Sequence, residues 1–333
     1  MATINDVAKL ANVSKSTVSN VVGDRKYVSE ELRQRVLAAC RELHYVPSFT
    51  ATTLVTKKTG IIGLFLDIEK RYDDFYGDLI KGVFTQAKKH QYKILLYYSS
   101  SPDDMRTSLV VDKEPIDGAI LLKPFVNDYR IDYILQDNLP YVLIGNSQKS
   151  VPSVDVDNRK IAYDITERLI GMGHRNFLFF TVDPRFSVAN DRIEGFKQAL
   201  RDNGLNMRGS KIVLTDHAGE EAAEILTHFY NEYGKYTAVL APSDIVAKRL
   251  YRVYQENGRQ VGKEISIAAM GGTEVAFDLS PQLTTVSVDY CRIGEECMEL
   301  LYRQISNCEL VEKSVNVDAK IIYTNSCVKN SGI

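Results

Sequence analysis

The sequence lacks any long apolar segment. A membrane helix needs about eighteen or more consecutive apolar residues, whereas the longest apolar runs here, such as Ile61–Leu66, have the length of a β-strand. Asp6 and Lys9 interrupt the first turns, so the N-terminus has no apolar signal-peptide core. We therefore expect no membrane association and a cytoplasmic location.

Cysteine is scarce, and the sequence signatures of metal sites and enzymes are missing. The five cysteines are odd in number and form no C-x-x-C pair, which argues against a disulfide framework or a zinc site. Gly258–Lys263 is one residue short of a P-loop, Gly271-Gly272 is no dinucleotide fingerprint, and G-x-S-x-G is absent. The adjacent pair Asp216-His217 fits a loop better than a catalytic dyad. We expect no cofactor, no metal and no enzymatic activity.

Charge is distributed unevenly along the 333 residues. Residues 1–58 hold nine basic and five acidic side chains, a net of +4, and the remainder holds 32 and 38, a net of −6. A basic head on an acidic body predicts an anionic partner for the head, with nucleic acid the first candidate. An ordinary fluctuation of charge is the alternative. With 44% apolar residues, the chain can bury cores for two or three domains.

Three short helices are predicted in the first 47 residues. Thr3 and Asp6 have the spacing of a capping box, Ser14 can cap a second helix that ends at Gly23, and Ser29 can cap a third. Three such helices with a tight turn between the first two form a helix-turn-helix unit. A small helical cap on a larger domain is the alternative. If the valines of the second helix face inward, five polar side chains project outward, where they can reach bases and phosphates: Lys15, Ser16, Thr17, Ser19 and Asn20.

The segment Thr3–Ser19 resembles the N-terminal signature of the lactose-repressor (LacI/GalR) family, T-x-x-D-V-A-x-x-A-x-V-S-x-x-T-V-S-R. The similarity continues through Tyr45-Val46-Pro47 and along the whole chain. It implies that Lys15 and Ser16 read base edges, while four residues contact phosphates: Thr3, Thr17, Ser19 and Tyr27. The family usually has Arg where this chain has Asn20. Arg recognises guanine and Asn recognises adenine, so we expect an operator that differs at that base pair.

The resemblance also implies a hinge over residues 48–59, which folds on the operator. Leu54 occupies the position of a leucine that wedges between base pairs in the minor groove. A plain linker, in which Leu54 packs on the body, is the alternative. Thr52 stands where the family has Arg, which puts one DNA contact per subunit in doubt.

From Gly60 onward, strand-like and helix-like segments alternate, which predicts an α/β body with parallel sheets. The predicted strands are Ile61–Leu66, Lys93–Tyr98, Asp117–Leu122, Pro140–Ile144, Phe177–Thr181, Lys211–Leu214, Thr237–Ala241 and Ile265–Ala269. The predicted helices are Asp74–Lys89, Arg159–Gly171, Asp191–Asn203, Glu220–Tyr233, Ser243–Gln255 and Cys291–Ile305.

This body resembles a two-lobed periplasmic-binding-protein-like fold with a cleft between its lobes. We expect a helix-turn-helix domain at 1–47, the hinge at 48–59 and an effector-binding and dimerisation domain at 60–333. Lobe 1 should span about 60–157 and 290–317, and lobe 2 about 158–289 and 318–333. The chain would then pass between lobes near Asp157, Asp289 and Val317.

Effector-binding residues follow from the resemblance and from side-chain chemistry. Arg192 matches the family arginine that binds ligand hydroxyls or carboxylates; a structural ion pair is the alternative. Phe75 and Tyr76 match aromatic positions at the cleft, with core packing as the alternative. Ser243-Asp244 and Asp289-Tyr290 also match cleft positions. Lys123, at the end of a strand, should point into the same cleft.

Met270-Gly271-Gly272 stands where sugar-binding relatives commonly have a carboxylate. A cleft with Arg192 and Lys123 but fewer acids favours an anionic effector such as a sugar phosphate. The sequence therefore predicts a ligand-gated repressor of a carbohydrate-utilisation operon, which binds a near-palindromic double-stranded DNA operator as a homodimer. Three alternatives stay open: a small-molecule receptor, an α/β enzyme, and a regulator that responds to a phosphorylated carrier protein.

Overall fold

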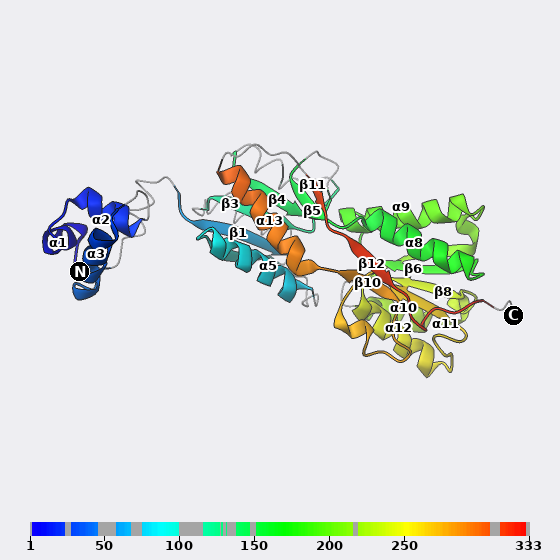
Figure 1. The fold of residues 1–333 in the computed structure, drawn as a ribbon. Helices are drawn as coiled ribbons and strands as arrows, with labels where there is room; N and C mark the ends of the chain where they lie inside the picture. The colour runs from blue at the N-terminus through cyan, green and yellow to red at the C-terminus, as the bar shows by residue number, and fades with distance from the viewer. Residues whose placement is uncertain are drawn as a thin grey trace. The chain divides into compact units, whose positions relative to one another are not determined.

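The computed structural model describes residues 2–23, 28–45, 58–67, 75–99, 116–126, 128, 131, 138–146, 151–215, 219–306 and 314–330. The chain divides into two compact units, a head at Met1–Thr59 and a body at Gly60–Ile333 (Figure 1). Tyr27, Thr52 and Leu54 lie outside the described residues, as do most of the predicted hinge and Asp216-His217.

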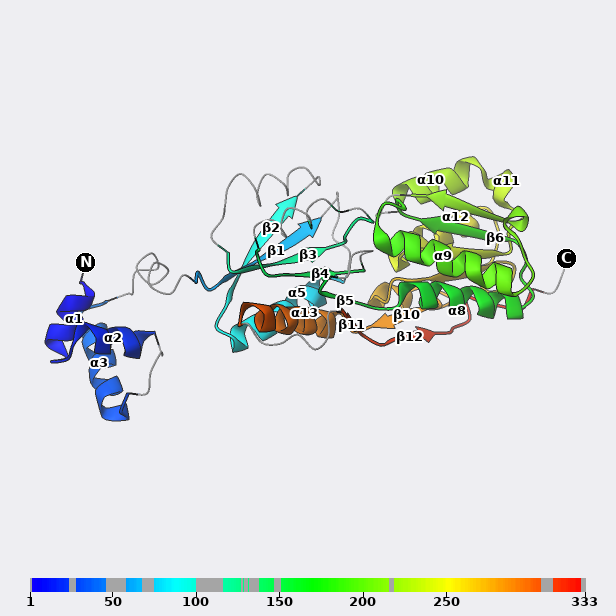
Figure 2. The same cartoon turned by 90° about the horizontal axis from the view of Figure 1, so that it is seen from above.

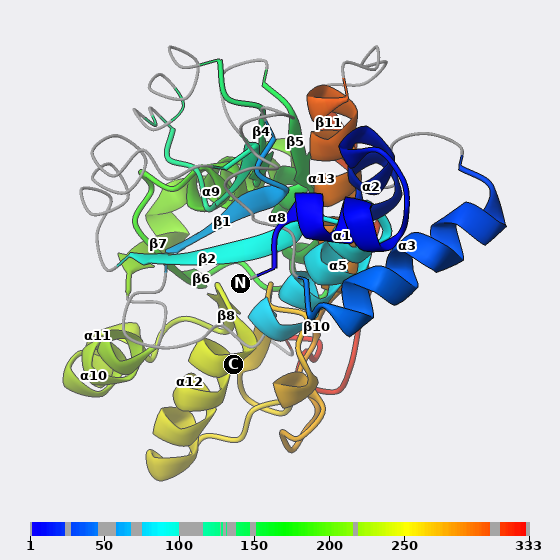
Figure 3. The same ribbon diagram turned by 90° about the vertical axis from the view of Figure 1, so that its left-hand side faces the viewer.

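The head consists of α1 (Ile4–Leu10), α2 (Lys15–Val22) and α3 (Glu30–Glu42) (Figure 3). The predicted capping box is confirmed, because the Asp6 carboxylate accepts from the Thr3 amide at 2.8 Å and the Thr3 hydroxyl accepts from the Asp6 amide at 3.4 Å. Ser14 caps α2 by accepting from the Thr17 amide at 3.1 Å. Ser29 stands at the N-cap of α3, but its side chain makes no cap hydrogen bond, so this part of the prediction is wrong.

Lobe 1 of the body surrounds a six-stranded parallel sheet in the order β11-β5-β4-β3-β1-β2. Its strands are β1 (Ile61–Asp67), β2 (Lys93–Ser99), β3 (Gly118–Leu122), β4 (Tyr141–Ile144), β5 (Ser153–Asp155) and β11 (Ser314–Asn316). Helices α5 (Tyr76–Lys89) and α13 (Tyr290–Ile305) pack side by side in this lobe (Figure 1).

Lobe 2 surrounds a four-stranded parallel sheet in the order β7-β6-β8-β9. Its strands are β6 (Phe177–Thr181), β7 (Ser210–Leu214), β8 (Ala238–Ala241) and β9 (Ser266–Ala269). Its helices are α8 (Asn158–Gly171), α9 (Ser187–Asp202), α10 (Glu220–His228), α11 (Tyr230–Tyr233) and α12 (Asp244–Glu256), with short 3-10 turns at Met207–Gly209 and Glu274–Ala276.

Two predicted helices need correction. The helix predicted at Glu220–Tyr233 is interrupted at Phe229, which has φ −104° and ψ 22° and separates α10 from α11. Helix α9 begins at Ser187, four residues before the predicted start, because Ser187 and Ala189 are buried and continue its apolar face. Arg192 consequently lies in the second turn of α9 and not in its first.

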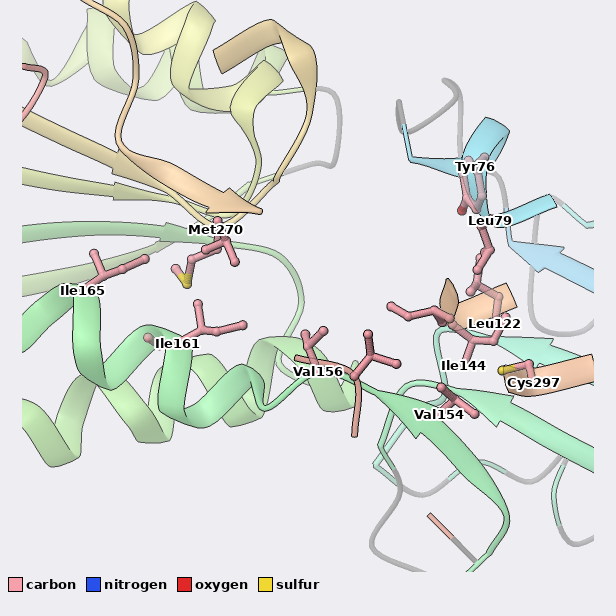
Figure 4. Packing of buried hydrophobic residues seen from close by; sticks show 14 of the residues in the cluster. Tyr76, Leu79, Leu122, Ile144, Val154, Val156, Ile161, Ile165, Met270 and Cys297 are labelled. Atoms are coloured by element: carbon pink, nitrogen blue, oxygen red, sulfur yellow. The ribbon is translucent and has the colours of Figure 1, made fainter. Parts of the chain in front are cut away.

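The lobes are connected three times: from β5 to α8, from β10 (Thr285–Val288) to α13, and from β11 to β12 (Ala319–Ile322) (Figure 2). Strands β10 and β12 pair with each other in antiparallel fashion. One apolar cluster extends through the first connection, where Val156 lies between the buried side chains of the two lobes (Figure 4). The two lobes therefore meet through packed side chains as well as through the connecting chain.

Candidate functional site

The outer face of α2 in the head is polar, as predicted. Val18 and Val21 are buried in the head core, whereas Lys15 and Ser16 are exposed and Thr17, Ser19 and Asn20 are partly exposed. The Ser14 hydroxyl lies 2.7 Å from the Ser16 hydroxyl and 2.8 Å from that of Thr17. A group of hydroxyls therefore surrounds the exposed N-terminus of α2, where free N–H groups and the helix dipole favour an anion such as phosphate.

The body has a cleft of about 150 Å³ between its lobes. Strand ends of both sheets meet there, because β3, β4 and β5 end in it from lobe 1 and β8 and β9 from lobe 2. Most of its lining is apolar. The polar and aromatic residues that line it are Phe75, Lys123, Asp155, Asn158, Ser187, Arg192, Ser243, Asp244, Thr273 and Tyr290. Six of the seven predicted effector residues are among them.

Arg192 holds together three parts of the cleft wall. Its Nε donates to Asn158 Oδ1 at 2.9 Å, Nη1 donates to the carbonyl of Pro242 at 2.9 Å, and Nη2 donates to the carbonyl of Met270 at 3.0 Å. These carbonyls follow β8 and β9. Burial lowers the pKa of Arg192, which nevertheless stays charged because an arginine starts from a very high value. Three of its five N–H donors are used in these bonds.

Asn158, the first residue of α8, connects this network to Asp155 in lobe 1. Asp155 is the last residue of β5, and its carboxylate accepts from the Val156 amide at 2.8 Å and from Asn158 Nδ2 at 3.1 Å. Burial raises the pKa of Asp155 to about 7, although these hydrogen bonds and the charge of Arg192 oppose the change. The prediction from sequence missed both residues. The rule that ligands bind at the carboxyl ends of parallel strands would have found Asp155, had the three-residue strand β5 been recognised.

Asp244 lines the cleft, but its carboxylate is bonded to the protein. Oδ2 accepts from the amide and hydroxyl of Thr273 at 2.6 and 2.9 Å, and Oδ1 accepts from the Thr285 hydroxyl at 2.6 Å. A Cβ at Gly271 would overlap Asp244. Gly272 has φ +80°, and a Cβ there would overlap the carbonyl of Val286. The glycine pair thus lets the turn pack against Asp244.

The aromatic residues separate into two environments. Phe75 stacks on Tyr290 with ring centroids 4.6 Å apart, and the Tyr290 hydroxyl donates to the carbonyl of Gly271 at 2.8 Å, which connects lobe 1 to lobe 2. Tyr76 is buried in the core, where the Lys123 ammonium lies 5.5 Å from its ring centre. Of the three predicted aromatic residues, Phe75 and Tyr290 line the cleft and Tyr76 does not. Ser243 also lines it and caps α12 by accepting from the Val246 amide at 3.3 Å.

No group of three His, Cys, Asp or Glu side chains among the described residues could hold a metal ion. Within the same ranges, no helix is both long and apolar enough to cross a membrane.

Comparisons with known proteins agree with the two-unit architecture. The family of bacterial regulatory proteins named after lacI matches residues 3–48, and a periplasmic binding protein-like domain matches residues 166–327. Catabolite control protein A of Priestia megaterium is 31% identical over 320 residues, which are 94% of this chain and 95% of that protein. The ribose operon repressor of Haemophilus influenzae is 28% identical over 312 residues, 92% and 93% of the two chains.

Among solved structures, the lac repressor dimer bound to operator and an anti-inducer has the same fold, with a TM-score of 0.83 at 22% identity over 98% of this chain and 99% of that one. The polar helix α2, the two-lobed body with its cleft, and a relative above 30% identity along nearly the full length lead to one conclusion. The chain belongs to the lacI family of bacterial regulatory proteins and is a DNA-binding regulator of transcription.

Proposed function

We propose that this regulator represses carbohydrate-utilisation genes and that a sugar in the interlobe cleft changes its affinity for operator DNA. The network of Asp155, Asn158 and Arg192 carries the proposal, because it offers charged acceptors and donors on one wall of a mostly apolar cleft. Such a network suits hydroxyl groups, while the stacked rings of Phe75 and Tyr290 suit the apolar face of a sugar ring. The names of the relatives, a catabolite control protein and a ribose operon repressor, point to the same class.

The cleft volume favours a small effector. A cavity of about 150 Å³ binds a molecule of roughly the size of benzene, so this cleft favours an effector no larger than a monosaccharide over a disaccharide. A sugar phosphate is a second candidate, since Lys123 and Arg192 both line the cleft. Asp155 beside Arg192 favours the neutral sugar, because it balances one of the two cations.

A thermal-shift screen of the full-length protein against monosaccharides, their phosphates, disaccharides, nucleobases and amino acids tests this proposal. A monosaccharide that raises the melting temperature, and that changes operator affinity in a separate titration, supports it. A nucleobase or amino acid as the best ligand would overturn the sugar assignment. A blank from protein that still binds operator would favour a phosphorylated carrier protein as the co-effector.

We propose residues 1–47 as the DNA-reading domain, residues 48–59 as the hinge and residues 60–333 as the effector-binding and dimerisation domain. In the head, Lys15, Ser16 and Asn20 would read bases from α2. Thr3, Thr17, Ser19 and Tyr27 would contact phosphates, and Leu54 in the hinge would enter the minor groove. The exposed N-terminus of α2 supports this assignment, since helices of this kind enter the major groove by their N-terminal residues.

Replacing Asn20 by Arg should change the preferred base pair from A·T to G·C, because Asn bonds adenine and Arg bonds guanine in the major groove. The expected change in discrimination is about 1–3 kcal/mol per half-site. Selection of preferred sites from random DNA by both proteins measures it. Asn5→Arg, at an exposed position of α1, adds the same charge and should leave the preferred site unchanged. Identical sites for wild type and Asn20→Arg would contradict the prediction.

Effector binding should depend on pH through Asp155. Burial raises its pKa to about 7, and an ionised carboxylate accepts hydroxyl hydrogen bonds that a protonated one resists. The affinity for a sugar should therefore be constant well above pH 7 and fall by up to about tenfold per pH unit below it. Calorimetric titration from pH 5.5 to 8.5 measures this. Asp155→Asn should remove the dependence, whereas Asp164→Asn, on the surface beside Lys160, should retain it.

A homodimer is part of the proposal. Phe84, Leu95 and Leu96 of lobe 1 are large apolar side chains that are 38–46% exposed, and Phe229 of lobe 2 is 42% exposed beside a groove between α10 and α12. Exposed apolar side chains of this size are candidates for an interface, and the lac repressor, which has the same fold, is a dimer in its solved structure. The mass of the protein in solution, measured by sedimentation, tests for the dimer.

A further inference from the structure

Two loops from different lobes pair with each other at the cleft. Pro124–Val126 follows β3 in lobe 1, and Arg185–Ser187 follows β6 in lobe 2. The Val126 amide donates to the carbonyl of Arg185 at 2.8 Å, and the Ser187 amide donates to the carbonyl of Pro124 at 3.1 Å. Phe125 and Phe186 therefore oppose each other as an antiparallel bridge. The two phenylalanines do not bond each other through their own N–H and C=O groups. In antiparallel strands, such a non-hydrogen-bonded pair has its Cα atoms about 4.5 Å apart.

The paired loops share a small apolar cluster. The rings of Phe125 and Phe186 stack with centroids 4.8 Å apart, and Val182, Val188 and Ala189 pack around them. This cluster is separate from the larger clusters that form the cores of the lobes. Phe186 is only 8% exposed, and its ring packs on Phe125 of lobe 1. Separation of the lobes would expose this apolar surface to water, at a cost in free energy.

Each loop is held in shape within its own lobe. In lobe 2, the Asp183 carboxylate accepts from the amide of Arg185 at 2.8 Å, and the Phe186 amide donates to the carbonyl of Asp183 at 3.0 Å. In lobe 1, the Phe125 amide donates to the Asp128 carboxylate at 3.1 Å. Because both loops are ordered by their own lobes, pairing them orders little additional chain, which makes the contact favourable.

The pairing borders the proposed effector site. Pro124, Ser187, Val182 and Val188 all line the cleft, together with Val156 and Tyr290 at the points where the chain passes between lobes. The cleft is thus bounded by covalent connections and by this non-covalent contact. Separating the loops leaves the three connections intact and opens the cleft.

We propose that Pro124–Val126 and Arg185–Ser187 form a clasp that holds the two lobes together at the cleft and opens to admit the effector. The gating role depends on the proposed effector site, whereas the closure does not. The effector can enter only when this contact opens, so the clasp lowers the apparent affinity for the effector by the free energy of opening.

Hydrogen–deuterium exchange of the full-length protein tests the clasp without any ligand. Phe186→Ala removes one ring of the stack, and exchange at the Val126 amide should then become about tenfold faster or more. Val126 belongs to the other lobe and its amide is bonded to the carbonyl of Arg185, so faster exchange there reports separation of the paired loops. Exchange at the Thr273 amide, on the far wall of the cleft, should also accelerate as solvent enters. Unchanged exchange at Val126 would overturn the proposal.

A second variant remains informative if Phe186→Ala folds poorly. In Phe125→Cys/Phe186→Cys, the predicted Cα separation lies within the range for a disulfide. Peptide mapping should find the two positions linked after mild oxidation, and oxidation should slow exchange at Thr273 below its reduced value. Failure of the two cysteines to join would also overturn the proposal. Phe277→Ala is the matched control: it also removes a phenylalanine ring from lobe 2, but this residue is 43% exposed and lies outside the clasp's apolar cluster, so Val126 should exchange as in the wild type.

Discussion

Arg192→Ala is expected to lower effector affinity by at least about a hundredfold and to destabilise the body by about 2–4 kcal/mol. The destabilisation arises because Asn158 Oδ1 and the carbonyls of Pro242 and Met270 all lose their donor. The loss of affinity has two sources: the remaining N–H groups of the guanidinium disappear from the cleft, and the ends of β8 and β9 lose the group that joins them. Urea unfolding and calorimetric titration with the best ligand of the screen measure the two effects.

The variant Arg175→Ala separates the loss of stability from the loss of effector affinity. Arg175 lies in the same lobe, and its Nη1 donates to the carbonyls of Ile170 and His174, both at 2.8 Å, but it does not line the cleft. Its loss should reduce stability and leave the affinity of the folded protein for the effector unchanged. Arg192→Lys keeps the charge but cannot reach three acceptors at once, so it should recover little affinity. Full affinity in Arg192→Lys would show that charge alone matters and would contradict this account.

The sequence predicted the local features of the fold well, because local residues determine them. The Thr3–Asp6 capping box and the Ser14 cap depend on residues three positions apart, and each of the eight predicted strands overlaps an observed one. The four further strands that the structure describes in the body, β5, β10, β11 and β12, have three or four residues each. Such short strands form only through a distant partner, as when Ser314 pairs with Ser153, and no window of sequence contains that information.

For the cleft, too, the sequence identified individual residues but not the contacts that depend on distant parts of the chain. Strand polarity and the family pattern identified Arg192 and Lys123 as cleft residues. They could not show that Arg192 uses three donors on Asn158, Pro242 and Met270, because these acceptors lie 34 to 78 positions away in sequence and meet only in the folded protein. Asp155 was missed with its strand, and its raised pKa depends on burial. A sequence pattern thus identifies which side chains have the chemistry to bind an effector. The tertiary structure determines which of their donors and acceptors are already bonded to the protein.

Gly294→Ala and Gly82→Ala are each expected to destabilise the body by about 3 kcal/mol or more, although alanine favours helices over glycine by about 1 kcal/mol. Helices α5 and α13 approach so closely that a Cβ at Gly82 would overlap the carbonyl of Cys291, and one at Gly294 would overlap the carbonyl of Leu79. Backbone atoms cannot move aside as a flexible side chain does, so the helices must separate. Gly77→Ala, also in α5 but with open space around its Cα, should change stability by less than about 1 kcal/mol.

Separation of these helices should also affect the cleft. Phe75 immediately precedes α5 and Tyr290 begins α13, so their 4.6 Å stack and the Tyr290–Gly271 hydrogen bond depend on the spacing between the two helices. A folded Gly294→Ala protein should therefore bind the effector more weakly, while Gly77→Ala binds normally. Urea unfolding followed by circular dichroism gives the stability, and titration below the unfolding transition gives the affinity. Unaltered stability in both Gly82→Ala and Gly294→Ala would contradict the close packing of α5 against α13 on which this argument depends.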